Sequence, residues 1–98
     1  MRFVTTPVVV YRTEYCPYCV MAERLLRARG IPFKEVDVTG NRGTRDWLVQ
    51  ATRQRTVPQI FIGERSIGGF TELAELDRRG ELLPMVQAAT AAGSAANT

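Results

Sequence analysis

The chain has 98 residues, of which 45% are apolar, and its formal net charge at pH 7 is +3. This length predicts one domain that buries about two thirds of its unfolded surface. The basic residues are not clustered, which argues against a nucleic-acid-binding protein, and no apolar stretch is long enough to cross a membrane.

The first predicted element is a buried strand over residues 7–12, a continuous apolar run rich in β-branched residues. A loop over residues 13–15 leads into a helix over residues 17–29. One face of this helix carries apolar residues at helical spacing, namely Tyr18, Met21, Ala22, Leu25 and Leu26. Glu23 and Arg27, four residues apart, are interpreted as an ion pair on its exposed face.

The only two cysteines, Cys16 and Cys19, lie where this helix begins. Pro17 suits the first helical position and biases Cys16 toward extended backbone, so Cys16 is predicted to cap the helix. Free N–H groups and the positive end of the helix dipole then lie beneath its sulfur and lower the pKa of the thiol. Cys19 follows one turn later, less exposed and close enough for a disulfide. This spacing indicates a nucleophilic Cys16 and a resolving Cys19.

Other interpretations of the pair are weaker. A tetrahedral zinc site needs four ligands, and the chain has no His and no third Cys, so only a metal bridged between two chains remains as an alternative. A structural disulfide would constrain the unfolded chain very little, because the loop has four residues. Two inert core cysteines do not explain the intervening proline. Redox chemistry is therefore preferred.

A second strand is predicted over residues 33–38, parallel to the first because a helix connects them. The next helix begins at Asn41 or Thr44 and ends near Thr52; its Trp47 is interpreted as a core residue. Residues 58–62 and 65–67 predict an antiparallel hairpin because only two residues separate them. Helices over residues 71–79 and 81–92 follow. Residues 1–92 are expected to form the domain, and residues 93–98 a flexible tail.

Three motifs together resemble the dithiol class of glutaredoxins: Cys16-Pro17-Tyr18-Cys19, Thr56-Val57-Pro58 and Gly68-Gly69. The resemblance extends from Val8 to about Val86. It implies an α/β protein with a thioredoxin-like fold, a four-stranded mixed sheet flanked by helices. The implied element order is β-α-β-α-β-β-α plus a C-terminal helix.

The resemblance also implies a glutathione site. Val57 would pair with the extended peptide like an added strand, next to a cis Val57–Pro58 bond. The γ-glutamyl carboxylate would bind at Phe70 and Thr71, and Glu72 would face the ammonium group. A plain strand start at Pro58 and a plain helix cap at Thr71 are the simpler interpretations. The full set of expected glutathione contacts is Thr13, Tyr18, Arg45, Thr56, Val57, Pro58, Gly69, Phe70, Thr71 and Glu72.

The chain departs from the family at Thr13, where glutaredoxins often carry a lysine that serves the thiolate and a ligand carboxylate. Arg12 is adjacent, but successive residues of a strand point to opposite sides. Arg45 matches, by resemblance, a helix position that contacts the glycyl carboxylate. We therefore expect Arg45 to hold that carboxylate, with Arg12 contributing little.

The implied activity is reduction of protein–glutathione mixed disulfides and of protein disulfides, with glutathione as co-substrate and no tightly bound cofactor or metal. Two alternatives stay open: a glutaredoxin-like protein reduced by thioredoxin reductase, and a dimeric carrier of an iron–sulfur cluster. Residues 1–6 show no signal-peptide pattern. A monomer in the cytoplasm, acting on glutathione and on proteins but not on nucleic acid or membranes, is expected.

Overall fold

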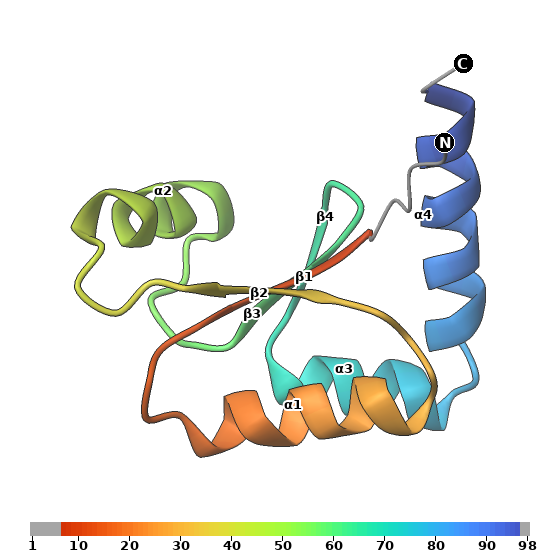
Figure 1. The fold of residues 1–98 in the computed structure, drawn as a ribbon, viewed down its shortest axis with the longest axis horizontal. Helices are drawn as coiled ribbons and strands as arrows, with labels where there is room; N and C mark the ends of the chain where they lie inside the picture. Colours follow the sequence, from red (N-terminus) through yellow and green to blue (C-terminus); the bar gives the residue numbers. More distant parts are fainter. Residues whose placement is uncertain (1–6, 97–98) are drawn as a thin grey trace.

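The computed structural model describes residues 7–96. The buried strand predicted over residues 7–12 lies inside a four-stranded sheet, as β1 (Val8–Arg12). It pairs in parallel with β2 (Lys34–Asp37) and antiparallel with β3 (Gln59–Ile62), and β3 continues through a tight turn into β4 (Arg65–Gly68). The sheet order is β2-β1-β3-β4 (Figure 1). The thioredoxin-like mixed sheet, the parallel pair and the antiparallel hairpin are confirmed.

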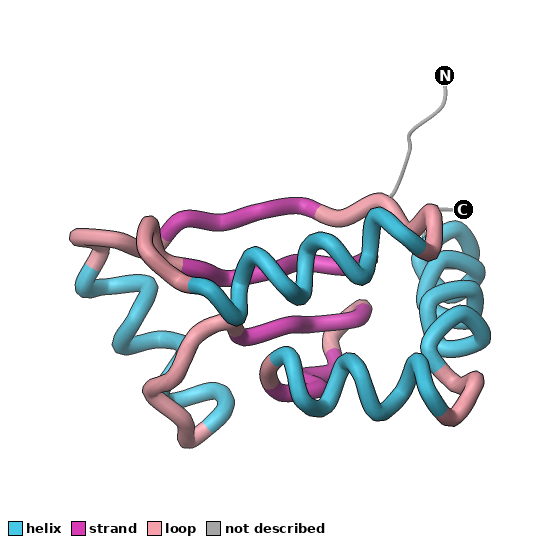
Figure 2. Tube along the Cα trace, turned by 90° about the horizontal axis from the view of Figure 1, so that it is seen from below, coloured by secondary structure: helices cyan, strands magenta, loops and turns pink. Residues whose placement is uncertain are grey.

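Helices cover the two faces of the sheet unequally. α1 (Pro17–Ala28) and α3 (Phe70–Arg78) lie side by side on one face (Figure 2). α2 (Arg42–Thr52) lies on the opposite side of the sheet, and α4 (Leu82–Ala96) stands across one end (Figure 1). No helix within residues 7–96 has both the length and the apolar character that crossing a membrane requires.

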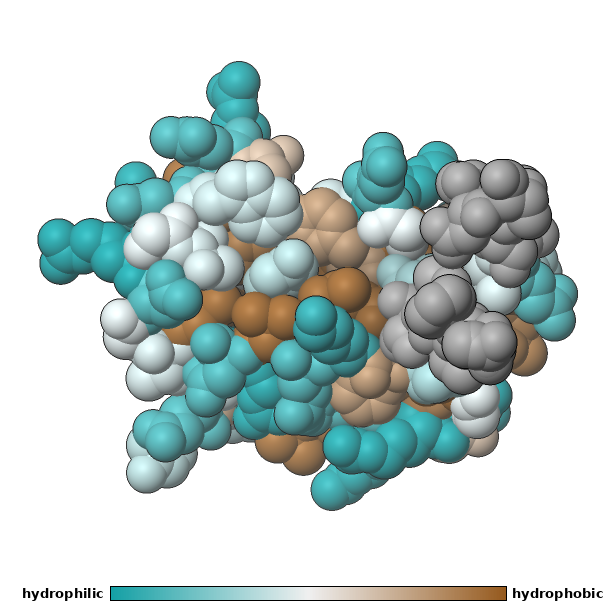
Figure 3. Space-filling model, turned by 45° about the horizontal axis from the view of Figure 1, so that its top comes forward, coloured by the Kyte–Doolittle hydropathy of each residue, from teal (hydrophilic) through white to brown (hydrophobic). Residues whose placement is uncertain are grey.

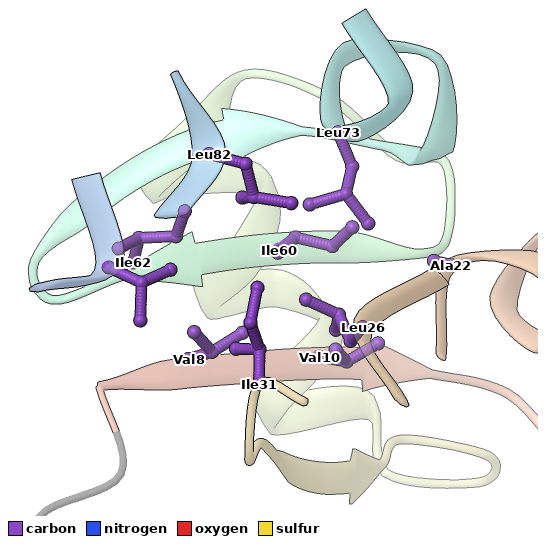
Figure 4. Packing of buried hydrophobic residues seen from close by; sticks show 10 residues of the cluster. Val8, Val10, Ala22, Leu26, Ile31, Ile60, Ile62, Leu73 and Leu82 are labelled. Atoms are coloured by element: carbon purple, nitrogen blue, oxygen red, sulfur yellow. The ribbon is translucent and has the colours of Figure 1, made fainter. Parts of the chain in front are cut away.

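The core lies between the sheet and the α1, α3 and α4 helices. Side chains alternate along a strand, so Val8 and Val10 of β1 point to this face together with Ile60 and Ile62 of β3 (Figure 4). Each helix contributes buried residues to the same cluster: Ala22, Leu26, Leu73, Leu82 and Val86. This packing fixes the start of α1 and the start of α3 at the same edge of the molecule.

The interpretation of Trp47 as a core residue is only partly right. Its ring packs on the outer face of the sheet, 5.8 Å from the ring centroid of Tyr11 and 6.0 Å from that of Phe61. It is nevertheless 48% exposed. α2 covers only part of this face, and apolar side chains remain visible in the middle of it (Figure 3).

The last helix is longer than predicted. α4 continues to Ala96, whereas the sequence predicts a helix that ends near residue 92 and a tail after it. The added residues are Gly93, Ser94, Ala95 and Ala96; the two alanines favour helix, the glycine does not, and the helical pattern of the sequence does not predict this continuation. Residues 97 and 98 of the expected tail, and residues 1–6 with the predicted absence of a signal peptide, lie outside the described residues.

Candidate functional site

Cys16 is the N-cap of α1, as predicted. Its backbone is extended (φ −146°, ψ 95°), Pro17 is the first helical residue, and the N–H of Cys19 donates a hydrogen bond to the Cys16 sulfur at 3.1 Å. The two cysteines form a disulfide with their Cα atoms 5.2 Å apart. Cys19 is fully buried, whereas Cys16 retains 8% exposure. The outer sulfur is therefore the one that an attacking thiol can reach.

The buried face of α1 differs from the predicted one. It consists of Cys19, Ala22, Glu23 and Leu26, while Tyr18 and Met21 are 59% and 42% exposed. The buried residues recur at the expected helical spacing. The buried face is nevertheless rotated around the helix axis relative to the predicted apolar face, so that it includes the Glu23 side chain. The prediction that Glu23 lies on the exposed face is wrong: it is only 2% exposed.

The burial of Glu23 is compensated by an ion pair with Arg12, which extends from β1. Nη1 of Arg12 donates to Oε1 of Glu23 at 2.7 Å and approaches Oε2 of Glu35 at 3.4 Å. Burial, followed by the neighbouring Glu35 carboxylate, raises the pKa of Glu23, while Arg12 acts in the opposite direction. Arg12 Nε also donates to the carbonyl oxygen of Thr13 at 3.2 Å. The Arg12 side chain is thus anchored between α1 and β2.

Beside the cysteine pair lies a hollow of about 520 Å³. Tyr18 of α1 and Phe70 of α3 stack across it with ring centroids 6.3 Å apart. The Val57–Pro58 peptide bond is cis, as predicted. All the residues expected to contact glutathione line this hollow, except Thr13 and Arg45. Gln54 and Arg55 line it as well. The complete lining is Tyr18, Gln54, Arg55, Thr56, Val57, Pro58, Gly69, Phe70, Thr71 and Glu72.

The start of α3, which forms one wall of the hollow, is held by a hydrogen bond from the backbone of its N-cap residue to a side chain of its first turn. Gly69 is the N-cap of α3, and its N–H donates to Oε1 of Glu72 at 2.8 Å. Thr71 is therefore inside the helix and exposed, and its interpretation as a plain helix cap is wrong. Gly68 adopts φ +105°, and a Cβ atom there would lie 2.9 Å from the Glu72 side chain. A Cβ on Gly69 would lie 3.3 Å from the carbonyl oxygen of Pro58, so small residues bring these two walls together.

Arg45 lies in an adjoining smaller hollow of about 130 Å³. Arg55, together with Gln54, Thr56 and Val57, lines both hollows. Sequence reasoning missed Arg55, although its charge directly before Thr56-Val57-Pro58 was a usable signal. Two arginines, Arg45 and Arg55, therefore line the hollows near Val57. Thr13 lines neither hollow.

The residues that the structure describes contain no group of three or more His, Cys, Asp or Glu side chains placed to hold a metal ion. The described groups offer a cysteine pair near a hollow with arginines at one end.

Comparisons with known proteins agree with this geometry. The family model described as glutaredoxin matches residues 8–67. A glutaredoxin of Pseudomonas aeruginosa is 42% identical over 82 residues, covering 84% of this chain and 98% of that protein. Glutaredoxin 3 of Escherichia coli K12 is 41% identical over 80 residues, or 82% and 96% of the two chains. A crystal structure of a buckwheat glutaredoxin–glutathione complex superposes with a TM-score of 0.81 at 34% identity, covering 85% of this chain and 78% of that chain.

Proposed function

This chain belongs to the glutaredoxin family, and from that premise we propose that it is a glutathione-dependent enzyme that reduces protein–glutathione mixed disulfides and protein disulfides. Thiol–disulfide oxidoreduction is the activity that membership of the family and the Cys16–Cys19 pair support. Cys16 is the proposed nucleophile and Cys19 the resolving thiol. Glutathione is the co-substrate, and no tightly bound cofactor is required.

The reaction begins with the Cys16 thiolate attacking the glutathione sulfur of a glutathionylated protein. The protein thiol leaves, and Cys16 carries the glutathione as a mixed disulfide. A second glutathione thiolate attacks the glutathione sulfur of that adduct, which releases oxidised glutathione and restores the Cys16 thiolate. With a protein disulfide as substrate, Cys19 attacks the first adduct, and two glutathiones then reduce the resulting Cys16–Cys19 disulfide.

The single observation that carries this proposal is the position of Cys16 at the α1 N-terminus beside the hollow of about 520 Å³. No other backbone group within residues 7–96 hydrogen-bonds to Val57, so its N–H and C=O are open to an extended peptide. The N-terminus of α3 at Phe70 and Thr71 suits a carboxylate. The similar buckwheat protein was crystallised with glutathione, which supports the same ligand here.

A coupled assay tests the glutathione requirement. We expect turnover of a glutathionylated peptide when glutathione, glutathione reductase and NADPH regenerate the enzyme, and none when thioredoxin reductase replaces the glutathione system. Cys16→Ser is the inactive control. Turnover with thioredoxin reductase alone would replace this proposal by the first alternative.

We further propose a cytoplasmic monomer, because a reducing, glutathione-rich compartment keeps this thiol pair functional. Anaerobic purification followed by size-exclusion chromatography tests the state of the protein. A colourless monomer is expected, and a coloured dimer would favour the cluster-carrier alternative.

A further inference from the structure

Because Cys19 is buried, its sulfur needs a proton donor inside the protein when the disulfide is opened in the dithiol reaction. When the Cys16–Cys19 disulfide opens, the electron pair of the S–S bond goes to the Cys19 sulfur, which is fully buried. Burial disfavours a charged thiolate, so this sulfur must gain a proton as it leaves. Solvent does not reach Cys19, and the proton has to come from a neighbouring group inside the protein.

Glu23 lies one helical turn beyond Cys19 on the same buried face of α1. Residues four apart on a helix are neighbours, and helix side chains lean toward the N-terminus, which is the direction of Cys19. Oε1 of Glu23 is held by Arg12 at 2.7 Å. Oε2 is buried without a hydrogen-bond partner among the described residues. The sequence places no other acid on this face of α1.

Three charged groups surround this carboxyl. Arg12 comes from β1, Glu35 from β2, and Arg27 from α1 itself at 3.9 Å. Burial and Glu35 raise the pKa of Glu23 despite Arg12. The carboxyl therefore keeps a proton at higher pH than an exposed glutamate does.

We propose that Glu23 carries the proton of the Cys19 thiol, an inference that rests on the proposed dithiol reaction. A glutathione thiolate attacks the Cys16 sulfur, the S–S bond breaks, and a mixed disulfide forms at Cys16. The Cys19 sulfur receives the bonding electron pair and takes the proton of the Glu23 carboxylic acid. The proton moves from a carboxylic acid to a thiolate, and a thiol is ordinarily the weaker acid of the two. Glu23 is left as a carboxylate paired with Arg12.

The oxidative direction uses the same proton in reverse. When Cys19 attacks the mixed disulfide between Cys16 and a substrate protein, its thiol proton returns to the Glu23 carboxylate. The substrate thiolate leaves, and the Cys16–Cys19 disulfide forms. Deglutathionylation that bypasses Cys19 never uses this proton, which separates the role of Glu23 from that of the rest of the site.

The test compares two reactions of the full chain. The first is opening of the Cys16–Cys19 disulfide by glutathione under single-turnover conditions, with rates expressed per glutathione thiolate. The second is deglutathionylation of a peptide in the Cys19→Ser background. Glu23→Gln should slow the first reaction at least about tenfold and leave the second unchanged. Glu23→Asp should partly restore the first, and Glu75→Gln, the same change at a distant site, should alter neither.

The pH dependence of the wild-type protein gives an independent readout if Glu23→Gln does not fold. The disulfide-opening rate per thiolate should fall as the pH rises through the pKa of Glu23, and deglutathionylation by Cys19→Ser should show no such step. A flat wild-type profile, an unchanged first reaction in Glu23→Gln, or equal slowing of both reactions would overturn the inference. Loss of deglutathionylation in Cys19→Ser itself would instead refute the proposed function.

Discussion

Arg45 and Arg12 differ in what already holds them. Arg12 contacts Glu23 and Glu35, whereas Arg45 is half-buried beside the site and forms no ion pair within residues 7–96. Arg45 is therefore the better candidate for a bidentate contact with the glycyl carboxylate. Arg55, which lines both hollows, is the second candidate.

We predict that Arg45→Ala raises the Michaelis constant for glutathione roughly tenfold, as loss of a charge-assisted hydrogen bond of about 1.5 kcal/mol would do. Arg12→Ala should change that constant less. It should instead lower the free energy of unfolding by about 1–3 kcal/mol, because the buried Glu23 loses its partner. Steady-state kinetics and urea unfolding measure the two effects. The reverse order of Michaelis constants would mean that Arg12 replaces the missing lysine.

At the scale of a single element, the N-terminus of α1 is the expected source of thiolate stabilisation. Position 13 carries Thr, not the lysine that the resemblance to glutaredoxins implies, and Arg12 is engaged by two carboxylates. We predict that the Cys16 thiol in Cys19→Ser titrates well below the ordinary value of about 8.5. Thiolate absorbance against pH measures it. A midpoint near the ordinary value would show that the helix terminus alone does not activate this cysteine.

The turn between β4 and α3 depends on glycine at one position. Gly68→Ala combines φ +105° with a Cβ 2.9 Å from Glu72, so we expect it to lower stability by about 1 kcal/mol or more. It should also raise the Michaelis constant for glutathione by displacing the Glu72 cap. Gly43→Ala in α2 is the matched control, since its Cβ would meet only Asn41 at 3.8 Å and should stabilise the helix by about 0.5 kcal/mol. Equal effects in thermal unfolding would contradict this account.

The pairing of α1 with α3 carries a pH dependence of stability. Arg29 donates two hydrogen bonds to Asp77, at 2.7 and 2.8 Å, and they lower the pKa of Asp77. A lowered folded-state pKa adds stability that is fully present above the ordinary Asp value and is lost as the pH falls through the lowered one. Asp77→Asn should therefore be less stable than wild type near neutral pH, and the difference should vanish in strong acid. Denaturant unfolding at both pH values tests this, and a difference that persists in acid would assign the loss to another cause.

At the scale of the whole molecule, the sequence predicts the architecture because each strand and helix has a local signal. The apolar run at β1, the helical period of α1 and the two-residue turn between β3 and β4 all act over short distances. The buried face of α1 differs from the predicted one because Glu23 is buried through its ion pair with Arg12 of β1. Helical periodicity within α1 does not reveal that partner. The exposure of Trp47 was misjudged because periodicity does not reveal how much of the sheet α2 covers.

In the candidate site, too, the features with a local sequence signal are predicted and those that depend on distant neighbours are not. The cysteine pair, the cis-proline and the glycine turn belong to contiguous motifs, and each motif contributes at least one residue to the same hollow, namely Tyr18, Thr56-Val57-Pro58 and Gly69. Arg55 and Glu23 have no motif of their own, since their importance comes from which neighbours the fold brings to them. A single sequence does not show which residues, distant along the chain, the fold brings into contact.

The central claim is that Cys16 attacks and Cys19 resolves, and the most direct measurement is turnover of the two serine variants with two substrates. On a glutathionylated peptide with glutathione, Cys16→Ser should be inactive and Cys19→Ser active. On a protein disulfide, Cys19→Ser should lose most of its activity. Equal loss from both changes on the glutathionylated peptide would contradict the assigned roles.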